Sequence, residues 1–523
     1  MAGVPESEWC TCEPKVEFEG TMYPPAAKMS IPGASWIGNM LGSGAIVLGV
    51  WAVAYLIRCL RSPLRKVPGP WYSLFTGAVL KYNELQGRRT RYIHSLHLKY
   101  GPTVRLSPGE ASFTGIDAIR EIYGSGGSGY EKTEFYNLFT VYGRRTMFST
   151  LDRESHARRK RVLADRYANT NVMKQPALSG IAERARRFVE LCQGSVGGSL
   201  DIYTTLHSYA FDCVTHHLFH PLCTNSLQNK HDGDVMREVT FDSSFKNRLV
   251  KYYNPSLYQI IEPLLSLITK PRATPLANKF VLDTSAQTDA SPFTLLDRLH
   301  QRKNGGDLEQ IDIAAECLDH MVAGIDTTGD ALCFLMYQLS LPSSAPFQRK
   351  LQAELAANPD PDETPFDKLP YLDAVVQEGL RCFPAIPMSL PRYVPSGGRH
   401  VDGYFMPQGT IVSCQAYSVH RINGDVFPHP ETFNPDRWLD VEGDATRRRY
   451  MFAFSHGGRG CVGRHLAFVE MKLLLRDIYS RYSTIPDSKM TDEAMAMSDQ
   501  IISSRPAGQE CLMRFIPLAD NAK

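Results

Sequence analysis

The feature that most constrains the fold is a long helical pattern in the middle of the chain, over residues 307–341. It begins where Asp307 and Gln310 have the spacing of a capping box, and it ends where Leu341 meets a proline. Most of its faces are apolar, and such a helix is normally buried inside a large protein. The sequence therefore predicts one long buried helix within a mainly helical body.

Composition agrees with a large globular protein. The chain has 523 residues, of which 43% are hydrophobic and 21% charged, and its formal net charge is +2. This balance argues against a nucleic-acid-binding protein, which normally has a concentrated basic excess. The 12 cysteines are scattered, and no pair after Cys12 has the C-x-x-C spacing of zinc and redox sites. We expect reduced thiols in one large domain.

An uncharged run precedes this domain. Residues 36–57 are long enough to cross a bilayer core of about 30 Å at about 1.5 Å per residue. Several arginines follow the run and several glutamates precede it, so the positive-inside rule places the basic flank in the cytoplasm. A buried core helix is the alternative. We expect a lumenal tail (1–35), a transmembrane anchor (36–57), a basic and Pro-rich hinge (58–72) and a catalytic body (73–523).

A glycine-rich loop around Cys461 contains the strongest chemical signal. Residues 454–467 read FSHGGRGCVGRHLA, and an apolar helical pattern follows them. A cysteine at the start of a helix lies at the positive end of the helix dipole, where backbone N–H groups favour the thiolate that metals bind. Glycines allow the loop to approach a flat ligand closely. Most cysteines are simply small buried hydrophobes, so these surroundings decide the interpretation.

This loop resembles the haem-binding signature of the cytochrome P450 family, F-x-x-G-x-R-x-C-x-G. The fixed positions are filled by Phe454, Gly457, Arg459, Cys461 and Gly463. The resemblance implies a haem b cofactor, with the thiolate of Cys461 as the axial ligand of the iron, Phe454 packed on the haem and Arg459 paired with its carboxylates. It also implies the family fold, a triangular, mainly α domain with small β-sheets, behind one N-terminal transmembrane helix.

Three further residues match the structural lock that the family has behind the haem. Glu378 and Arg381 form its E-x-x-R motif, and residues three apart on a helix face the same way. Arg437 follows in the segment FNPDRW. A lone Glu and Arg at this spacing are more often a solvated surface pair. The resemblance gives these three residues a structural role.

The segment AGIDTT, residues 323–328, is similar to the oxygen-activating motif of the family. The resemblance implies that Thr327 hydrogen-bonds dioxygen and that Asp326 relays protons from solvent. Heterolytic cleavage of dioxygen needs two protons, and an acid beside a hydroxyl can route them through a dry site. The alternative is that Thr327 only caps the carbonyl group four residues earlier in a packed helix.

Weaker matches concern the haem propionates and the substrate pocket. Arg392 resembles a family arginine that reaches a propionate, and His156 and Lys160 stand where the family usually presents W-x-x-x-R, with a solvated basic helix as the alternative. Asp319 shares a helix face with Ala323, and we hypothesise that it binds a polar or amine group of the substrate rather than facing water. The pocket candidates are Tyr142, Met147, Phe148, Asp319, Ala323, Ile386, Met388 and Leu390.

The order of the segments resembles the microsomal class of the family. This implies location in the endoplasmic reticulum membrane and electrons from NADPH through a separate NADPH-cytochrome P450 reductase, with cytochrome b5 as a second donor, since the chain has no flavin or nicotinamide fingerprint. Phrases such as VPGPWYS look most like fungal members that modify polyketides, terpenoids or alkaloids. We expect hydroxylation, epoxidation or further oxidation of an apolar small molecule. The alternatives are an isomerase or dehydratase without a reductase, a sterol-type oxidase, and a haem sensor or carrier.

Overall fold

The computed structural model describes residues 34–124, 129–304 and 308–518, with residues 34–45 in backbone only. The chain divides into two compact units, residues 1–58 and 59–523. Almost all of the predicted lumenal tail lies outside the described residues. The predicted anchor lies within a continuous helix, α1 (Ala34–Arg61). In the described part of the chain, no helix is both long and apolar enough to cross a membrane, so the predicted transmembrane helix is not confirmed.

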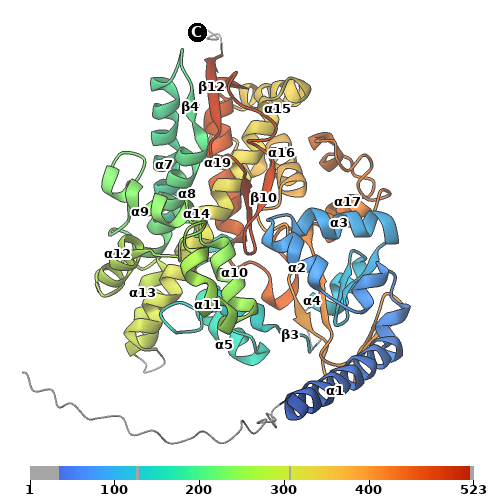
Figure 1. The fold of residues 1–523 in the computed structure, drawn as a ribbon. Coiled ribbons are helices and arrows are strands. Elements are labelled where there is room, and N and C mark those ends of the chain that lie inside the picture. Colours follow the sequence, from blue (N-terminus) through green and yellow to red (C-terminus); the bar gives the residue numbers. More distant parts are fainter. Residues whose placement is uncertain (1–33, 125–128, 305–307, 519–523) are drawn as a thin grey trace, which may run out of the picture. The chain divides into compact units, whose positions relative to one another are not determined.

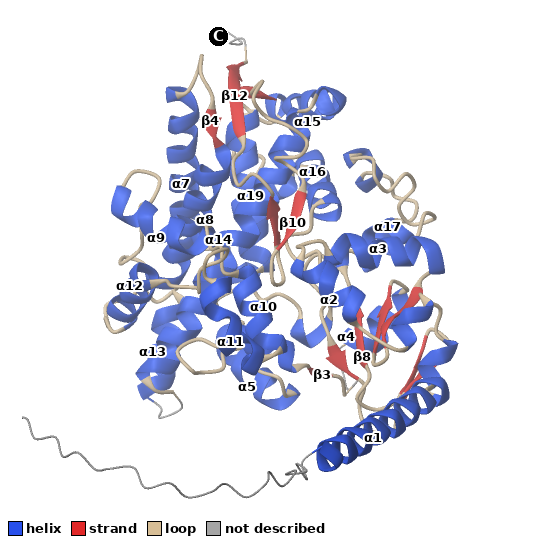
Figure 2. Cartoon of the chain, viewed as in Figure 1, coloured by secondary structure: helices blue, strands red, loops and turns tan. Residues whose placement is uncertain are grey.

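The second unit is mainly helical with small sheets, as predicted (Figures 1 and 2). Its helices wind around α14, the long helix of the central pattern. The helices after α1 are α2 (Ala78–Leu85), α3 (Arg89–Tyr100), α4 (Ile116–Tyr123), α5 (Arg153–Leu163), α6 (Asn169–Val172), α7 (Gln175–Gly194), α8 (Ile202–Phe219), α9 (Lys230–Thr240), α10 (Phe245–Tyr253), α11 (Pro255–Leu265), α12 (Pro275–Ser285), α13 (Leu295–Asn304), α14 (Gln310–Ser340), α15 (Ala345–Ala357), α16 (Pro370–Cys382), α17 (Ala416–Ile422), α18 (Asp444–Tyr450) and α19 (Arg464–Tyr479).

The strands of the described residues form four small sheets. The largest has the order β1-β2-β8-β5-β3, in which only β2 and β8 pair in parallel, with Ser112 opposite Ser413. A three-stranded sheet has the order β4-β12-β9, and β6–β7 and β10–β11 are separate hairpins. The strands are β1 (Thr103–Ser107), β2 (Glu110–Phe113), β3 (Glu131–Lys132), β4 (Leu200–Asp201), β5 (Arg392–Tyr393), β6 (Arg399–Val401), β7 (Tyr404–Met406), β8 (Ile411–Cys414), β9 (Tyr482–Pro486), β10 (Met497–Asp499), β11 (Ser504–Pro506) and β12 (Leu512–Pro517).

The central helix α14 is 31 residues long and ends just before Pro342, as the sequence predicts. Its start differs from the prediction. Asp307 lies outside the described residues, and the capping box is formed by Glu309 and Asp312, because each side chain accepts the other residue's backbone N–H. The predicted boundary was therefore wrong by two residues, while the length and burial of the helix are as expected.

Close packing of α14 on α8 depends on two glycines. A Cβ atom on Gly324 would lie 2.6 Å from a methyl carbon of Val214, and one on Gly329 would lie 2.8 Å from the ring of His207. Both distances are far below van der Waals contact, so any larger residue would push the helices apart. Almost every side chain of α8 is buried, which fixes the position of α14 in the core.

The Pro-rich segment predicted as a hinge is bound to the body. Residues 63–66 and 71–74 form short 3-10 turns, and Val67 is buried between them. The guanidinium of Arg105 on β1 donates to the carbonyl groups of Leu64, Val67 and Pro70, at 2.8 to 3.1 Å. These bonds satisfy backbone oxygens that prolines leave without helical partners. The structure thus places this segment against β1.

Candidate active site

Cys461 lies in a loop with a tightly hydrogen-bonded backbone, directly before α19. The N–H of Cys461 donates to the carbonyl of Phe454 at 2.9 Å, and the N–H of Gly460 donates to that of Gly457 at 3.1 Å. Gly457 has a φ of +66°, a conformation that favours glycine. The backbone conformation therefore explains why residue 457 of this loop is a glycine.

The thiol of Cys461 lies inside the protein but is exposed to a cavity. Burial raises the pKa of this thiol above its usual value. Hydrogen bonds from the N–H groups of Gly463 and Arg464, together with the positive charge of Lys160, act in the opposite direction. The start of the helix therefore favours the thiolate, as predicted, but burial has the larger effect on the pKa of the free thiol.

Residues of α14 face the same cavity, which has a volume of about 350 Å³. Ala323 is exposed to it, and Asp326 and Thr327 also line it. The hydroxyl of Thr327 donates to the carbonyl of Ala323 at 2.6 Å, which is the capping bond of the alternative interpretation. Thr327 nevertheless remains at the cavity wall, so the capping bond and the predicted role are compatible.

The carboxyl group of Asp326 is buried and takes part in a polar chain. Burial raises its pKa, while the nearby charges of His207, Arg272 and Arg505 lower it. Its Oδ1 accepts a hydrogen bond from Thr240 at 3.1 Å. Burial therefore favours the protonated form of this carboxyl group more than water does, and a carboxyl group can take up and release protons.

A second buried acid, one turn further along α14, was missed by the sequence analysis. Burial raises the pKa of Asp330 to about 6, and its Oδ1 lies 3.5 Å from Nε2 of His207. Asp330 lines the cavity as Asp326 does. The only available signal was the i, i+4 spacing of the two aspartates, which places both on one helix face.

A group of cationic side chains also lines the cavity. Arg392 donates to the hydroxyl of Tyr136 at 2.8 Å, and Arg459 pairs with Glu131 at 2.9 Å. Lys132, which the sequence analysis missed, is buried among them and donates to the carbonyl of Phe148 at 2.5 Å. Burial, followed by the charges of Arg392 and Arg459, lowers the pKa of Lys132 well below its usual value. Anionic groups of a ligand would relieve this repulsion.

The two residues predicted from the basic helix, α5, differ in position. His156 lines the cavity, and burial and the neighbouring cations lower its pKa to about 3. Lys160 does not line the cavity. Its Nζ donates to the carbonyl groups of Gly458 and Gly460, at 3.0 and 2.9 Å. Lys160 thus holds the cysteine loop in place, and its predicted contact with a propionate stays a prediction.

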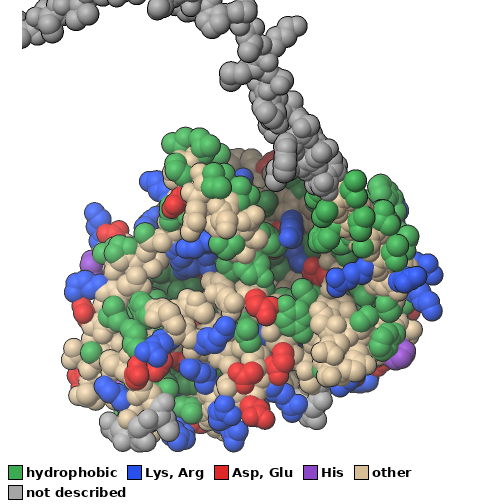
Figure 3. All heavy atoms as spheres, turned by 60° about the horizontal axis from the view of Figure 1, so that its bottom comes forward, with side chains coloured by type: hydrophobic (Ala, Val, Ile, Leu, Met, Phe, Trp, Pro, Cys, Tyr) green, Lys and Arg blue, Asp and Glu red, His purple; other side chains and the backbone are tan. Residues whose placement is uncertain are grey.

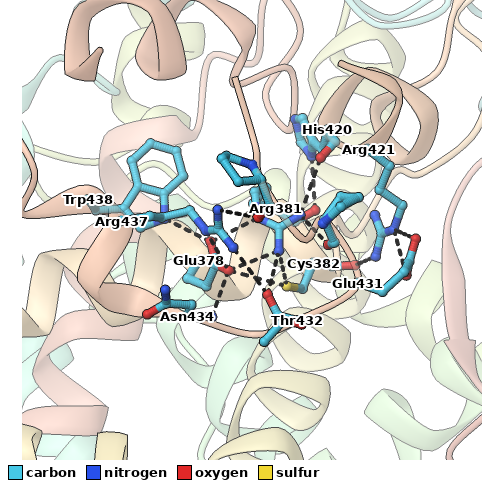
Figure 4. Close-up of polar contacts among 12 residues, drawn as sticks. Glu378, Arg381, Cys382, His420, Arg421, Glu431, Thr432, Asn434, Arg437 and Trp438 are labelled. Atoms are coloured by element: carbon cyan, nitrogen blue, oxygen red, sulfur yellow. Dashed lines mark hydrogen bonds and ion pairs between the residues drawn. The ribbon is translucent and has the colours of Figure 1, made fainter. Parts of the chain in front are cut away.

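The predicted lock is assembled as a buried network (Figure 4). The carboxylate of Glu378 accepts two hydrogen bonds from Arg381 and one from Arg437, at 2.8 to 3.1 Å. It also accepts from the indole N–H of Trp438 and from the backbone N–H of Asn434, both at 2.9 Å. The alternative of a solvated surface pair is excluded by geometry, because Glu378 and Arg381 are fully buried.

The predicted pocket residues are largely brought together. Met147, Phe148, Asp319, Ala323, Ile386 and Leu390 line the cavity, whereas Tyr142 and Met388 are not among the lining residues. Asp319 faces the cavity rather than bulk solvent, and burial raises its pKa to about 6. Its predicted contact with a polar substrate group stays a prediction.

Another missed residue is Glu470 on α19. Its side chain lines the cavity, and its Oε2 accepts a hydrogen bond from Thr328 at 3.1 Å, while its Oε1 has no hydrogen-bond partner in the described structure. Burial raises its pKa to about 8. No sequence pattern marks this residue, since one glutamate in an apolar helix normally faces water.

These residues fit a haem. Cys461 and Ala323 are both exposed to the interior, from a loop and a helix that face one cavity. Lys132, Arg392 and Arg459 offer cations for carboxylates within hydrogen-bond reach of the same space. Phe454 lines the cavity as well, and Gly463 offers no side chain at its wall. The cavity therefore contains a thiol that can bind a metal, a stretch of α14 that is exposed to the cavity, and three cationic side chains in its wall.

Comparison with known proteins decides the family. The family model for Cytochrome P450 matches residues 67–512. The chain belongs to the cytochrome P450 family. This P450 is 28% identical to cytochrome P450 monooxygenase stcB of Emericella nidulans, over 92% of this chain and 94% of that protein. It is also 28% identical to cytochrome P450 monooxygenase orf2 of Aspergillus niger, over 91% and 98%, and 26% identical to cytochrome P450 monooxygenase cypX of Dothistroma septosporum, over 86% and 90%.

The P450 is therefore a monooxygenase, an oxidoreductase that uses haem iron. When bound, the haem activates dioxygen, assisted by electron donation from a thiolate ligand. In this chain Cys461 would supply the thiolate, and Lys132, Arg392 and Arg459 would hold the propionates. The lock around Glu378 is distinct from these groups, because Glu378, Arg381 and Arg437 do not line the cavity.

Proposed function

We propose that this P450 oxidises an apolar secondary metabolite of a fungus, such as a polyketide, terpenoid or alkaloid, by hydroxylation, epoxidation or further oxidation. The observation that supports this most is that Cys461 and the pair Asp326 and Thr327 face one cavity from opposite elements. The similarity to fungal monooxygenases over most of the chain gives the direction for the substrate class.

In this proposal the residues of α14 deliver protons. Asp326 takes a proton from the polar chain that includes Thr240, and Thr327 passes it on at the cavity wall. To do so, the hydroxyl of Thr327 turns from the carbonyl of Ala323, to which it donates now. Apolar residues such as Val322 and Leu390 keep bulk water away, which favours directed proton transfer.

We assign the electrons to NADPH, delivered by a separate NADPH-cytochrome P450 reductase, with cytochrome b5 as a second donor. The sequence has no flavin or nicotinamide fingerprint of its own, which supports an external donor. A reductase-independent isomerase or dehydratase is the second candidate. It has no need of a proton relay, so the positions of Asp326 and Thr327 favour the first.

Attachment to the endoplasmic reticulum membrane is also part of the proposal. Residues 36–57 carry no charge, and the side chains of Val47, Val50 and Trp51 in α1 are each more than half exposed. We expect the full chain in microsomes to resist extraction by alkaline carbonate, and Val50→Arg to reduce this resistance. Full extraction of the wild-type chain would contradict the anchor.

The test of the haem-thiolate assignment is the reduced, carbon-monoxide-bound difference spectrum. We expect the strongly red-shifted Soret band of thiolate ligation in the wild type and in Cys223→Ala, a control cysteine outside the cavity. We expect no such band in Cys461→Ala. A folded, haem-loaded wild type without the band would remove the basis of the proposal.

The test of the electron source follows on the same samples. With reductase present, we expect oxygenated product from a panel of polyketides and terpenoids only when NADPH is added. Product formed at the same rate without NADPH and reductase would favour the isomerase or dehydratase. Sterol-type activity would appear as preferential oxidation of sterols in the same panel.

A further inference from the structure

One end of the cavity contains an unusual group of charges, next to the C-terminus of α9. Arg248 on α10, Arg272 before α12 and Arg505 on β11 line the cavity there; we call these three residues the arginine roof. Among the described residues, the carboxylate of Asp242 forms ion pairs with two of them, Arg248 and Arg272. Figure 3 shows Lys and Arg side chains set inside hollows of one face of the molecule.

Asp242 pairs with two residues of the roof only at long range. Nη1 of Arg248 and Nε of Arg272 lie 3.9 and 3.8 Å from the same oxygen, Oδ2, which is beyond hydrogen-bond distance. That oxygen accepts instead from the hydroxyl of Ser244 at 2.9 Å, and Oδ1 accepts from the N–H of Ser244 at 2.8 Å. The carboxylate is thus already engaged by its own turn, and the two guanidinium groups share it only at long range.

The three arginines differ in what else they bind. Arg505 donates to the carbonyl groups of Thr240 and Asp242, at 2.9 and 3.2 Å, and Arg248 donates to that of Leu138 at 2.8 Å. In the described chain, Arg272 makes no hydrogen bond at all. Its side chain is 29% exposed and that of Arg248 is 21% exposed. Arg272 is therefore the roof residue with the most unused donors.

The charges of the roof repel each other. Burial, and then the neighbouring charge of Arg272, lower the pKa of Arg248 to about 10. The charges of Arg272 and Arg505 also act on Asp326, and that of Arg505 acts on Asp330, both on α14. Among the described residues neither carboxyl group forms an ion pair with the roof, because Asp326 accepts from Thr240 and Asp330 lies next to His207. A buried cation with incomplete pairing is costly, so this end of the cavity favours an added anion.

The surroundings of the roof are apolar. The side chains of Phe139, Val239, Phe245, Val322, Ile501 and Ile502 line the same cavity. A ligand that satisfies both features has an apolar body and one anionic end. Guanidinium groups pair with carboxylates in a planar, two-pronged geometry, which makes a carboxylate the matching group.

We propose that the substrate is an apolar carboxylic acid whose ionised carboxylate binds Arg272 and Arg248, with Arg505 fixing the position of the turn at Asp242. The proposal rests on the proposed function, because it names the substrate class of the same cavity. It also predicts where oxidation occurs. With the carboxylate held at the roof, the part of the molecule remote from it is presented toward Thr327 and Cys461.

The test is binding of matched acids and esters to the haem-loaded enzyme. The probes are dodecanoic acid, 2-naphthoic acid and anthraquinone-2-carboxylic acid, each compared with its methyl ester. Binding is measured at pH 7.5 by the shift of the Soret band and by equilibrium dialysis. We expect at least one acid to bind about tenfold more tightly than its ester, since the ester cannot form charge-assisted hydrogen bonds. A higher salt concentration should weaken binding of the acid and leave binding of the ester unchanged.

Variants assign the effect to the roof. Arg272→Gln should lower the affinity for the acid about tenfold and leave the affinity for the ester unchanged. Asp242→Asn should raise the affinity for the acid. Arg237→Gln is the matched control, because Arg237 is an exposed arginine of α9 that does not line the cavity, and it should change neither affinity. General destabilisation of the enzyme would not lower the affinity for the acid in one variant and raise it in the other.

Two results would overturn the inference. One is equal affinity of acid and ester on all three skeletons, including the absence of binding by any of the six probes. The other is an acid preference that survives in Arg272→Gln and in Arg248→Gln. The carbon-monoxide difference spectrum of the same samples separates these failures from failure of the proposed function, because a normal thiolate band would leave the monooxygenase assignment in place.

Discussion

Arg381 and Glu378 form a two-pronged ion pair that is closed off from solvent on every side. Nε of Arg381 donates to Oε2 at 2.8 Å, and Nη2 donates to Oε1 at 2.9 Å. Burial by itself would raise the pKa of Glu378, but its bonds with Arg381 and the charge of Arg437 outweigh burial and lower it. This pair therefore depends on its complete set of partners.

Removing the charge of Glu378 should strongly destabilise the P450. Glu378→Gln leaves two buried guanidinium groups without a counter-charge, and breaking such a pair costs about 3–5 kcal/mol. We expect a loss of that size in the free energy of unfolding of the holoenzyme, measured in urea. Glu154→Gln, at an exposed pair with Arg158, should change it by less than about 1 kcal/mol. Equal effects of the two substitutions would contradict the network.

Neutralising Asp326 should slow reductase-supported oxidation. Asp326→Asn keeps the shape of the side chain but removes its ability to exchange protons, and such groups contribute roughly 10²–10⁴-fold. We expect product formation with NADPH to fall at least 100-fold, roughly the low end of that range. Oxidation driven by hydrogen peroxide, which brings its own protons, should fall far less. A parallel loss in both assays would point to damage to the cavity instead.

Thr240→Val provides the graded comparison for Asp326. It removes one hydrogen bond to Oδ1 of Asp326 and leaves the carboxyl group in place. We expect a smaller decrease than in Asp326→Asn, with a shifted pH profile of product formation. An unchanged pH profile would show that Thr240 does not tune this acid.

The buried Glu470 should make stability depend on pH. Burial raises its pKa to about 8, so in the folded state it keeps a proton that the unfolded chain releases above its ordinary value of 4.5. Between these values the folded state binds more protons, and this group lowers stability as pH rises, by at most about 1.4 kcal/mol per pH unit. We expect Glu470→Gln to match the thermal midpoint of wild type near pH 5 and exceed it near pH 8.

Thr328→Val separates titration from hydrogen bonding in that experiment. It removes the hydroxyl that donates to Glu470 but leaves the carboxyl group to titrate. The decline of the thermal midpoint with pH should therefore persist in this variant. If Glu470→Gln showed the same decline as wild type, the pH dependence would belong to another group.

Lys132 should contribute to retention of the haem. Its ammonium group is buried next to Arg392 and Arg459, and these repulsions are relieved when carboxylates lie among them. We expect Lys132→Met to increase the rate of haem transfer to apomyoglobin about tenfold, the effect of losing one charged hydrogen bond. Lys279→Met, at a surface lysine 76% exposed, is the control. Equal transfer rates would exclude Lys132 as a haem contact.

The sequence alone determined the family and the local chemistry of this protein. The five fixed positions around Cys461 lie in one short loop, and Asp326 and Thr327 lie in the six-residue segment AGIDTT, so the resemblance that identifies them is carried by short local segments. The length of α14 is set by its apolar pattern and by the proline that follows it. The predicted anchor has an equally local pattern, but no helix among the described residues is both long and apolar enough to cross a membrane, so the anchor stays a prediction.

Only the tertiary structure decided which distant residues share the cavity. Lys132, Asp330 and Glu470 are ordinary charged residues in the sequence, and their burial results from packing between elements far apart in the chain. The partners of Lys160 were also decided by tertiary packing. Its ammonium group donates to carbonyl groups about three hundred residues away and does not line the cavity. The arginine roof joins α10, the segment before α12 and β11. No local pattern encodes it, because the cost of burying its charges depends on neighbours that only folding provides.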